Sequence, residues 1–215
     1  GNVSAIFGEL ITLLEENKRK GNTEELSAIL PYSREQFSVP NNLYIIGTMN
    51  TADRSVEALD TALRRRFSFE EMMPKEDMDE IKILNISGSV IDFKEVLRTI
   101  NKRLEKLVSR DHRIGHSYFI SGEDETWEYY HRAFTNKIIP LLQEYFYGDY
   151  AKMCLVLGRG FVEINTTLSD DHGDKFFAIA EHDALDDFKT KKVWYVKNIT
   201  TEDEFAKALE TLLNK

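Results

Sequence analysis

The sequence contains few of the residues that cross-link a chain or interrupt its helices and strands. Its 215 residues include one cysteine, four prolines and eleven glycines. A single cysteine, Cys154, excludes an intrachain disulfide framework and favours a reducing, cytoplasmic setting. With 42% hydrophobic residues the composition also excludes collagen-like and low-complexity classes, so we expect a chain that buries real cores.

Long apolar runs and an excess of positive charge are also missing. No run approaches the roughly 20 residues of a membrane span, so we expect no membrane partner. The 28 lysines and arginines against 37 acidic residues give a net charge of −9. Because domains that grip nucleic acid backbones are basic, we expect that this segment does not hold DNA non-specifically.

The first residues are patterned as a helix followed by a polar stretch. Apolar residues recur at spacings of three and four over 2–16, which predicts an amphipathic helix. The polar residues 17–34 predict a loop or an exposed hairpin.

A strand, helix, strand order follows. The continuous apolar run 43–49 is typical of a strand buried on both faces, and it ends at the polar Asn50. A helix is predicted over 55–66 and a short strand over 67–72. This order predicts a parallel unit, in which functional groups gather at the carboxyl ends of the strands.

Beyond Pro74 the pattern becomes helical. Apolar stripes predict helices over 93–108 and 127–145, with Pro140 kinking the second or dividing it into two helices.

Shorter elements complete the chain. We expect a helix over 149–156, strands over 161–164 and 193–196, and a final helix whose Thr201 and Glu204 have capping-box spacing.

Two stretches carry a resemblance to a known family. They read TMNTADRS at Thr48–Ser55 and ALRRRFSF at Ala62–Phe69, and both words resemble the McrB family of AAA+ motor subunits. RIGHSYF at Arg113–Phe119 and LLQEYF at Leu141–Phe146 are similar to the helical lid of that family. The resemblance covers roughly residues 2–165.

The resemblance implies an α/β fold class with three parts. Residues 1–74 would be the carboxyl-terminal part of a parallel-sheet AAA+ P-loop NTPase core. Residues 75–165 would be a helical lid, and 166–215 a small carboxyl-terminal α/β appendage that the family does not explain.

The function implied is that of a GTP-hydrolysing motor in a modification-dependent, 5-methylcytosine-specific restriction system. The parent protein would bind GTP with Mg²⁺ in a ring, a hexamer by analogy, drive an McrC-like nuclease subunit, and bind DNA through other parts. Two alternatives stay open: an ATP-dependent remodelling protein of the MoxR kind, and a non-catalytic interaction module.

Asn50 resembles the residue that orients water and senses the terminal phosphate. An amide suits this role because it donates to a phosphate oxygen and accepts from water without adding charge. Without the resemblance, an equally good interpretation is that Asn50 caps the turn after the strand.

The arginine cluster at 64–66 ends a predicted helix, where cations complement the helix dipole. The resemblance implies that Arg65 and Arg66 act on the nucleotide of a neighbouring subunit, with Asp60 orienting them, whereas Arg64 is structural. A guanidinium suits the stabilisation of charge on a transferred phosphoryl group.

Two further residues complete the candidate site. Asp53 either lies near the phosphates and the subunit interface or caps a helix. Arg113, at the start of the lid, is a candidate second sensor of the nucleotide.

No metal site is expected. His112 and His116 have the spacing of a helical zinc pair but lack the accompanying glutamate, and Asp170–Asp174 lacks the ligand spacing of a calcium loop.

The phosphate-binding sequence GxxxxGK[ST] and an apolar strand ending in Asp-Glu are both missing. We therefore expect that these 215 residues alone do not hydrolyse nucleotide, and that a longer parent protein carries both motifs upstream.

Overall fold

A computed structural model describes residues 6–50, 52, 61–122, 125–169 and 191–215. The chain divides into two compact units, Gly1–Met72 and Met73–Lys215. No helix within the described ranges combines the length and apolar character that crossing a membrane requires.

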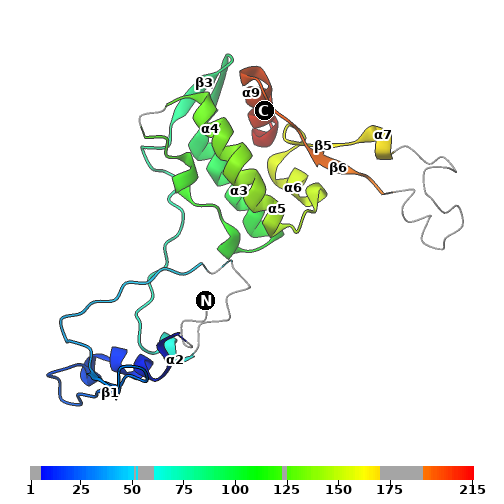
Figure 1. Cartoon of the computed structure of the whole chain (residues 1–215). Helices are drawn as coiled ribbons and strands as arrows, with labels where there is room; N and C mark the ends of the chain where they lie inside the picture. The colour runs from blue at the N-terminus through cyan, green and yellow to red at the C-terminus, as the bar shows by residue number, and fades with distance from the viewer. Residues whose placement is uncertain (1–5, 51, 53–60, 123–124, 170–190) are drawn as a thin grey trace, which may run out of the picture. The chain divides into compact units, whose positions relative to one another are not determined.

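The first unit has little regular structure (Figure 1). It contains the 3₁₀ helices η1 (Gly8–Leu14) and η2 (Glu16–Lys18), the two-residue strands β1 (Ala28–Ile29) and β2 (Gln36–Phe37), and the short helix α2 (Thr61–Arg64). Strands β1 and β2 pair antiparallel, so the exposed hairpin predicted within 17–34 exists, although its second strand lies just beyond that range.

The α-helix predicted over 2–16 is confirmed at residues 6–7 and is wrong in type over Gly8–Leu14. Gly8 has a φ of +51°, a conformation that interrupts an α-helix, and the segment continues as the 3₁₀ helix η1. The expected apolar face is retained at its end, where Leu13 and Leu14 are buried.

The strands predicted over 43–49 and 67–72 do not form. No ladder includes either segment in the described part of the chain, and Tyr44, Ile46 and Met72 are largely exposed. A strand is stabilised by hydrogen bonds to neighbouring strands, and none is paired with these residues here. Their apolar character is therefore not matched by burial.

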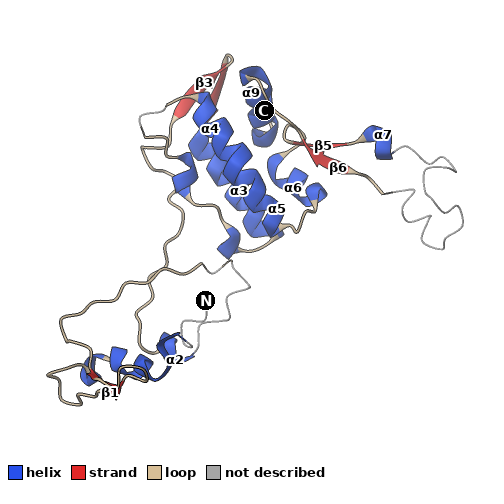
Figure 2. Ribbon diagram, in the orientation of Figure 1, coloured by secondary structure: helices blue, strands red, loops and turns tan. Residues whose placement is uncertain are grey.

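The second unit is a helical fold with two small antiparallel ladders (Figure 2). Strands β3 (Ile83–Ile86) and β4 (Ser89–Asp92) form a hairpin, and β5 (Val162–Ile164) pairs with β6 (Trp194–Val196). The helices are α3 (Phe93–Leu107), α4 (Trp127–Ala133), α5 (Ile139–Tyr145), α6 (Tyr150–Leu157), α7 (Thr166–Ser169) and α9 (Glu202–Leu213), with 3₁₀ helices η3 (Arg110–His112) and η4 (His116–Phe119).

The β3–β4 hairpin was not expected from the sequence. Its turn places both Ser87 and Gly88 at positive φ, 49° and 89°. Such a turn matches the right-handed twist of the flanking strands, and the Ser-Gly pair is its signal in the sequence.

The long helix expected over 127–145 is divided as Pro140 suggested. A π-helical turn, η5 (Phe134–Ile138), separates α4 from α5, and Pro140 lies in the first turn of α5. Because proline has no N–H to donate, the backbone hydrogen bonds must rearrange at this point.

One continuous core joins the helices of the second unit. Phe134 stacks on Phe161, with ring centroids 5.0 Å apart, and contacts Phe205 of α9 edge-on at 5.7 Å. Phe93 of α3 stacks on Tyr130 at 3.5 Å. The carboxyl-terminal helix, expected in a separate appendage, thus shares its core with α3 and α4.

The loop before β5 lies against the backbone of α9 at Gly160. A Cβ added there would lie 2.4 Å from the Ala208 Cα and 2.9 Å from the Ala208 carbonyl oxygen. Only glycine lets the two backbones come this close.

We predict that Gly160→Ala lowers the free energy of unfolding by about 1–3 kcal/mol, because the added methyl group forces the loop and α9 apart. Urea denaturation followed by circular dichroism measures this change. Gly115→Ala is the matched control, since its Cβ would meet only Ser117 Oγ at 3.6 Å. Equal stabilities of the two variants would contradict the close packing.

The capping box predicted for the last helix is confirmed. Thr201 Oγ1 accepts a hydrogen bond from Glu204 N at 3.3 Å, and the Glu204 carboxylate accepts from Thr200 N at 2.9 Å and from Thr201 N at 3.2 Å. These backbone donors favour the charged form and lower the pKa of Glu204.

A pKa that is lower in the folded state contributes stability above the ordinary glutamate value, and this contribution is lost as the pH falls through the folded value. We therefore expect Glu204→Gln to flatten the acid side of the stability curve. Melting temperatures between about pH 6 and pH 3 measure it. Glu202→Gln in the same helical turn is the control, and parallel curves for wild type and Glu204→Gln would refute the assignment.

Candidate functional site

The candidate site residues fall in both units. Asn50, Arg65 and Arg66 belong to the first unit and Arg113 to the second. Asp53 and Asp60 lie outside the described residues, as does Asp170–Asp174.

Asn50 is exposed, and the oxygen of its side-chain amide is hydrogen-bonded. Its Oδ1 accepts a hydrogen bond from Ala52 N at 3.1 Å, which is the turn-capping contact considered from the sequence. The Nδ2 group has no partner in the described part of the chain. The capping and ligand-binding interpretations are therefore compatible, because the free end of the amide is a donor of the kind that meets a phosphate oxygen.

The arginine cluster is divided by its contacts. Arg66 is half-buried and forms an ion pair with Glu15, Nη2 to Oε1, at 2.6 Å. Arg64 and Arg65 are exposed, and neither forms an ion pair with any residue that the structure describes. The cluster thus contains one arginine held within its own unit and two whose guanidinium groups face solvent.

This division separates the two expected finger residues. A guanidinium that acts on a neighbouring subunit must be available at the surface, and Arg65 meets this condition. Arg66 is engaged by Glu15, which links the end of α2 to the turn between η1 and η2. The expected orienting residue, Asp60, is not among the described residues.

Arg113 directly follows η3, and its guanidinium group is held by Glu105 of α3. Its Nε donates to Glu105 Oε2 at 3.0 Å, and Nη2 contacts the same oxygen. The two flanking residues, His112 and Ile114, are buried. Arg113 is therefore a partly exposed cation on an anchored segment of backbone.

Arg113 also lines an open hollow of about 480 Å³ at the start of the second unit. The other lining residues are Pro74, Lys75, Glu76, Asp77 and Met78. Sequence reasoning selected Arg113 but missed Lys75 and Glu105, whose proximity to Arg113 depends on the tertiary fold.

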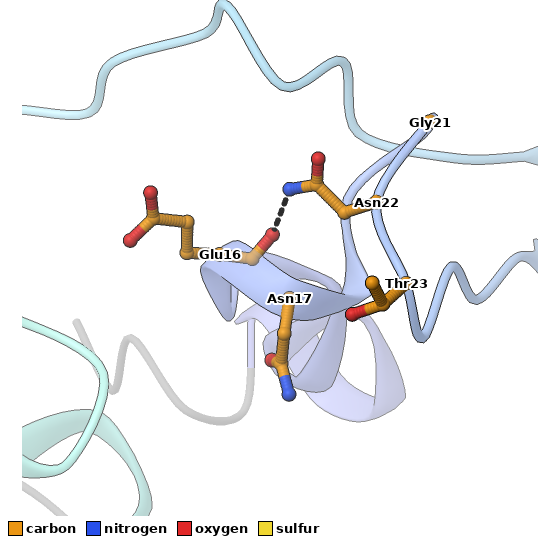
Figure 3. Close-up of a pocket in the computed structure, with 5 residues that line it drawn as sticks. All are labelled: Glu16, Asn17, Gly21, Asn22 and Thr23. Atoms are coloured by element: carbon orange, nitrogen blue, oxygen red, sulfur yellow. Dashed lines mark hydrogen bonds between the residues drawn. The ribbon is translucent and has the colours of Figure 1, made fainter.

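A second open hollow lies in the first unit, and two of the residues that line it are hydrogen-bonded to each other. It is lined by Glu16, Asn17, Gly21, Asn22 and Thr23 (Figure 3). Asn22 Nδ2 donates to the Glu16 carbonyl oxygen at 2.5 Å, as the dashed line in Figure 3 marks. Because this contact closes the loop on itself, we assign the hollow to the turn structure.

His112 and His116, which have the spacing of a helical zinc pair, make separate contacts. His112 Nδ1 lies 2.8 Å from Ser109 Oγ, whereas His116 Nδ1 accepts from Lys75 N at 3.1 Å. No group of three or more histidine, cysteine or acidic residues with metal-binding geometry occurs within the described ranges.

Comparison with known proteins finds a family model that matches each unit. Residues 2–67 match the model of the AAA domain of the dynein-related subfamily, and residues 92–154 match the model of the alpha-helical lid domain of McrB. The two matches follow each other in the order expected of an AAA+ core and its lid.

Two curated relatives cover most of this chain. It is 40% identical over 163 residues to the EcoKMcrB subunit of the type IV methyl-directed restriction enzyme of Escherichia coli K12, a match that covers 69% of this chain and 35% of the relative. It is 32% identical over 158 residues to the YdiS component of the type II restriction enzyme BsuMI of Bacillus subtilis 168, covering 66% of this chain and 45% of the relative.

The chain thus spans less than half the length of either relative. Both relatives are restriction proteins, and the lid model is specific to McrB. With a partial AAA+ core followed by this lid, the chain belongs to the McrB-like AAA+ restriction proteins.

Proposed function

We propose that this chain is part of a motor subunit that hydrolyses GTP in a ring, a hexamer by analogy, and thereby drives a partner endonuclease of the McrC type on modified DNA. The observation that carries the proposal is Arg65, which is exposed and forms no ion pair with any described residue, in a chain that matches an AAA domain model and the McrB lid model. It is the group that a ring motor needs at a subunit boundary.

The chain's own residues supply part of such a site. Asn50 would donate from Nδ2 to the terminal phosphate and orient the attacking water. Arg65 would enter the site of the neighbouring subunit and stabilise the charge that develops on the phosphoryl group. Arg113 would bind phosphate, and Asp53 and Asp60 are proposed at the interface between subunits.

The phosphate cradle and the carboxylates that hold Mg²⁺ are not in this sequence. The residues present therefore fit a nucleotide only as the sensing and finger side of a site. Bound Mg²⁺ would neutralise phosphate charge, and the residues that hold it would come from elsewhere in the parent protein. DNA recognition is likewise proposed for other parts, in keeping with the net charge of −9.

The engagement of Arg66 by Glu15 bears on its expected role. Acting on a neighbour would require this partly buried ion pair to open. We propose that Arg66 supports the position of Arg65, and that Arg65 makes the contact across the boundary.

The test uses a longer version of the protein that includes its nucleotide-binding motifs, with steady-state phosphate release measured in GTP and in ATP. We expect GTP to be preferred. Preference for ATP with unchanged variant behaviour would move the motor to the MoxR-like remodelling class. Turnover of neither nucleotide would favour a non-catalytic interaction module.

We predict that Arg65→Ala lowers the rate of GTP hydrolysis by about 10³-fold or more, because a finger arginine stabilises charge in the transition state. The matched control is Arg64→Ala, which removes an adjacent exposed arginine that also lacks an ion pair in the described structure. A similar loss in both variants would show that the effect is one of general charge or folding.

We predict that Asn50→Ala lowers turnover by about 10²-fold, because it removes a donor to the reacting phosphate. Exposed Asn41→Ala is the control. Mixing Arg65→Ala subunits with Asn50→Ala subunits tests action across the boundary, since the second subunit supplies Arg65 to a site where Asn50 is intact. Mixtures no more active than the separate variants would overturn the placement of Arg65 in trans.

A further inference from the structure

The backbone around Arg113 is fixed from two sides. Asn101, almost fully buried on α3, accepts a hydrogen bond from Ile114 N at 2.8 Å and donates to the Ile114 carbonyl oxygen at 3.2 Å. On the other side, the His112 ring packs edge-on against Tyr145 at 4.7 Å. Arg113 therefore lies between two anchored residues, and a change in its contacts must come from its side chain.

That side chain is held by a weak partner. Glu105 and Arg113 are both partly exposed, at 42% and 27% of their side-chain surface. Both contacts of the guanidinium go to the same carboxylate oxygen. An ion pair this accessible to water contributes little stability. A phosphate with more than one negative charge attracts the guanidinium more strongly than one carboxylate does, and it matches the guanidinium geometry equally well.

The hollow beside Arg113 has the charge to receive such an anion. Of its two acidic residues, Asp77 Oδ1 accepts from Arg98 Nη2 at 2.5 Å, and Glu76 Oε1 accepts from Asn101 Nδ2 at 3.2 Å. Lys75 is exposed and has no ion pair in the described part of the molecule. Among the residues that the structure describes, the hollow thus offers Lys75, which has no ion pair, and Arg113, whose guanidinium is restrained by Glu105.

We infer that Glu105 is the resting counterion of Arg113, which nucleotide phosphate displaces, so that this carboxylate sets the affinity of the site for nucleotide. The inference rests on the proposed function, in which Arg113 contacts phosphate, and adds a positioning residue that acts through it. When the site is empty, Glu105 keeps the guanidinium ordered on the lid. When phosphate arrives, the guanidinium exchanges one anionic partner for another.

Removing the competitor should strengthen binding. We expect Glu105→Gln to lower the dissociation constant for a fluorescent GTP analogue by about two- to five-fold, the range that an exposed ion pair allows. Arg113→Ala should weaken binding, and adding Glu105→Gln to it should change nothing further, because the effect of Glu105 passes through Arg113. Fluorescence titration of the longer protein measures all four affinities.

Glu95→Gln is the matched control, because it removes the same charge from the same helix, where Glu95 forms an exposed ion pair with Lys215. Weaker binding in Glu105→Gln, or tighter binding in Glu95→Gln to the same extent, would overturn the inference. So would a Glu105→Gln gain that persists in the Arg113→Ala background.

The outcome is separable from that of the proposed function. If Arg65→Ala and Asn50→Ala abolish hydrolysis while the Glu105→Gln and Arg113→Ala affinities equal that of wild type, the motor assignment stands and the counterion role fails. Melting temperatures of the Glu105 and Arg113 variants within about 2 °C of wild type would exclude general unfolding as the cause.

Discussion

Burial of one face of α3 is the constraint on which the second unit depends. Phe93, Val96, Leu97, Ile100 and Leu104 are all inaccessible to solvent and lie on one side of the helix. Asn101 follows Ile100 and is buried with it. It pairs with both polar groups of the Ile114 backbone, which satisfies its amide in the core and fixes the segment that carries Arg113. The packing that stabilises the lid therefore also positions its candidate sensor.

The carboxyl-terminal helix closes the same core. Phe205 lies among the rings of Trp127, His131, Phe134 and Phe161, and the loop at Gly160 meets the α9 backbone almost directly. Hydrogen bonds at the surface add to this, since Glu202 accepts from Ser87 N at 2.8 Å and Ser89 Oγ donates to Glu210 Oε1 at 2.6 Å. The segment after the McrB lid match is thus part of the structural support of the lid.

The first unit contains the most distinctive sequence motifs but little regular structure. The motifs are TMNTADRS and ALRRRFSF, and the described residues around them form only short helices and two-residue strands. A parallel sheet forms only when several strands pair, because each strand must share its hydrogen bonds with neighbours. The side chains proposed for catalysis, Asn50 and Arg65, are correspondingly exposed.

The sequence by itself determined the family and the helices that carry long apolar stripes. It also determined two helix boundaries, one near a proline and one at a capping box. Helix α3, the break near Pro140 and the Thr201 capping box follow from local patterns and formed as expected. Periodicity failed at 43–49, where apolar residues stay exposed because a strand needs partners that local sequence does not provide. The apolar pattern also did not predict the β3–β4 hairpin, because its Ser-Gly turn is a weak signal.

Only the tertiary structure decided that Arg66 forms an ion pair with Glu15 and Arg65 does not, and that Glu105 and Lys75 lie beside Arg113. These contacts join residues from different elements, so they depend on how the chain folds back on itself.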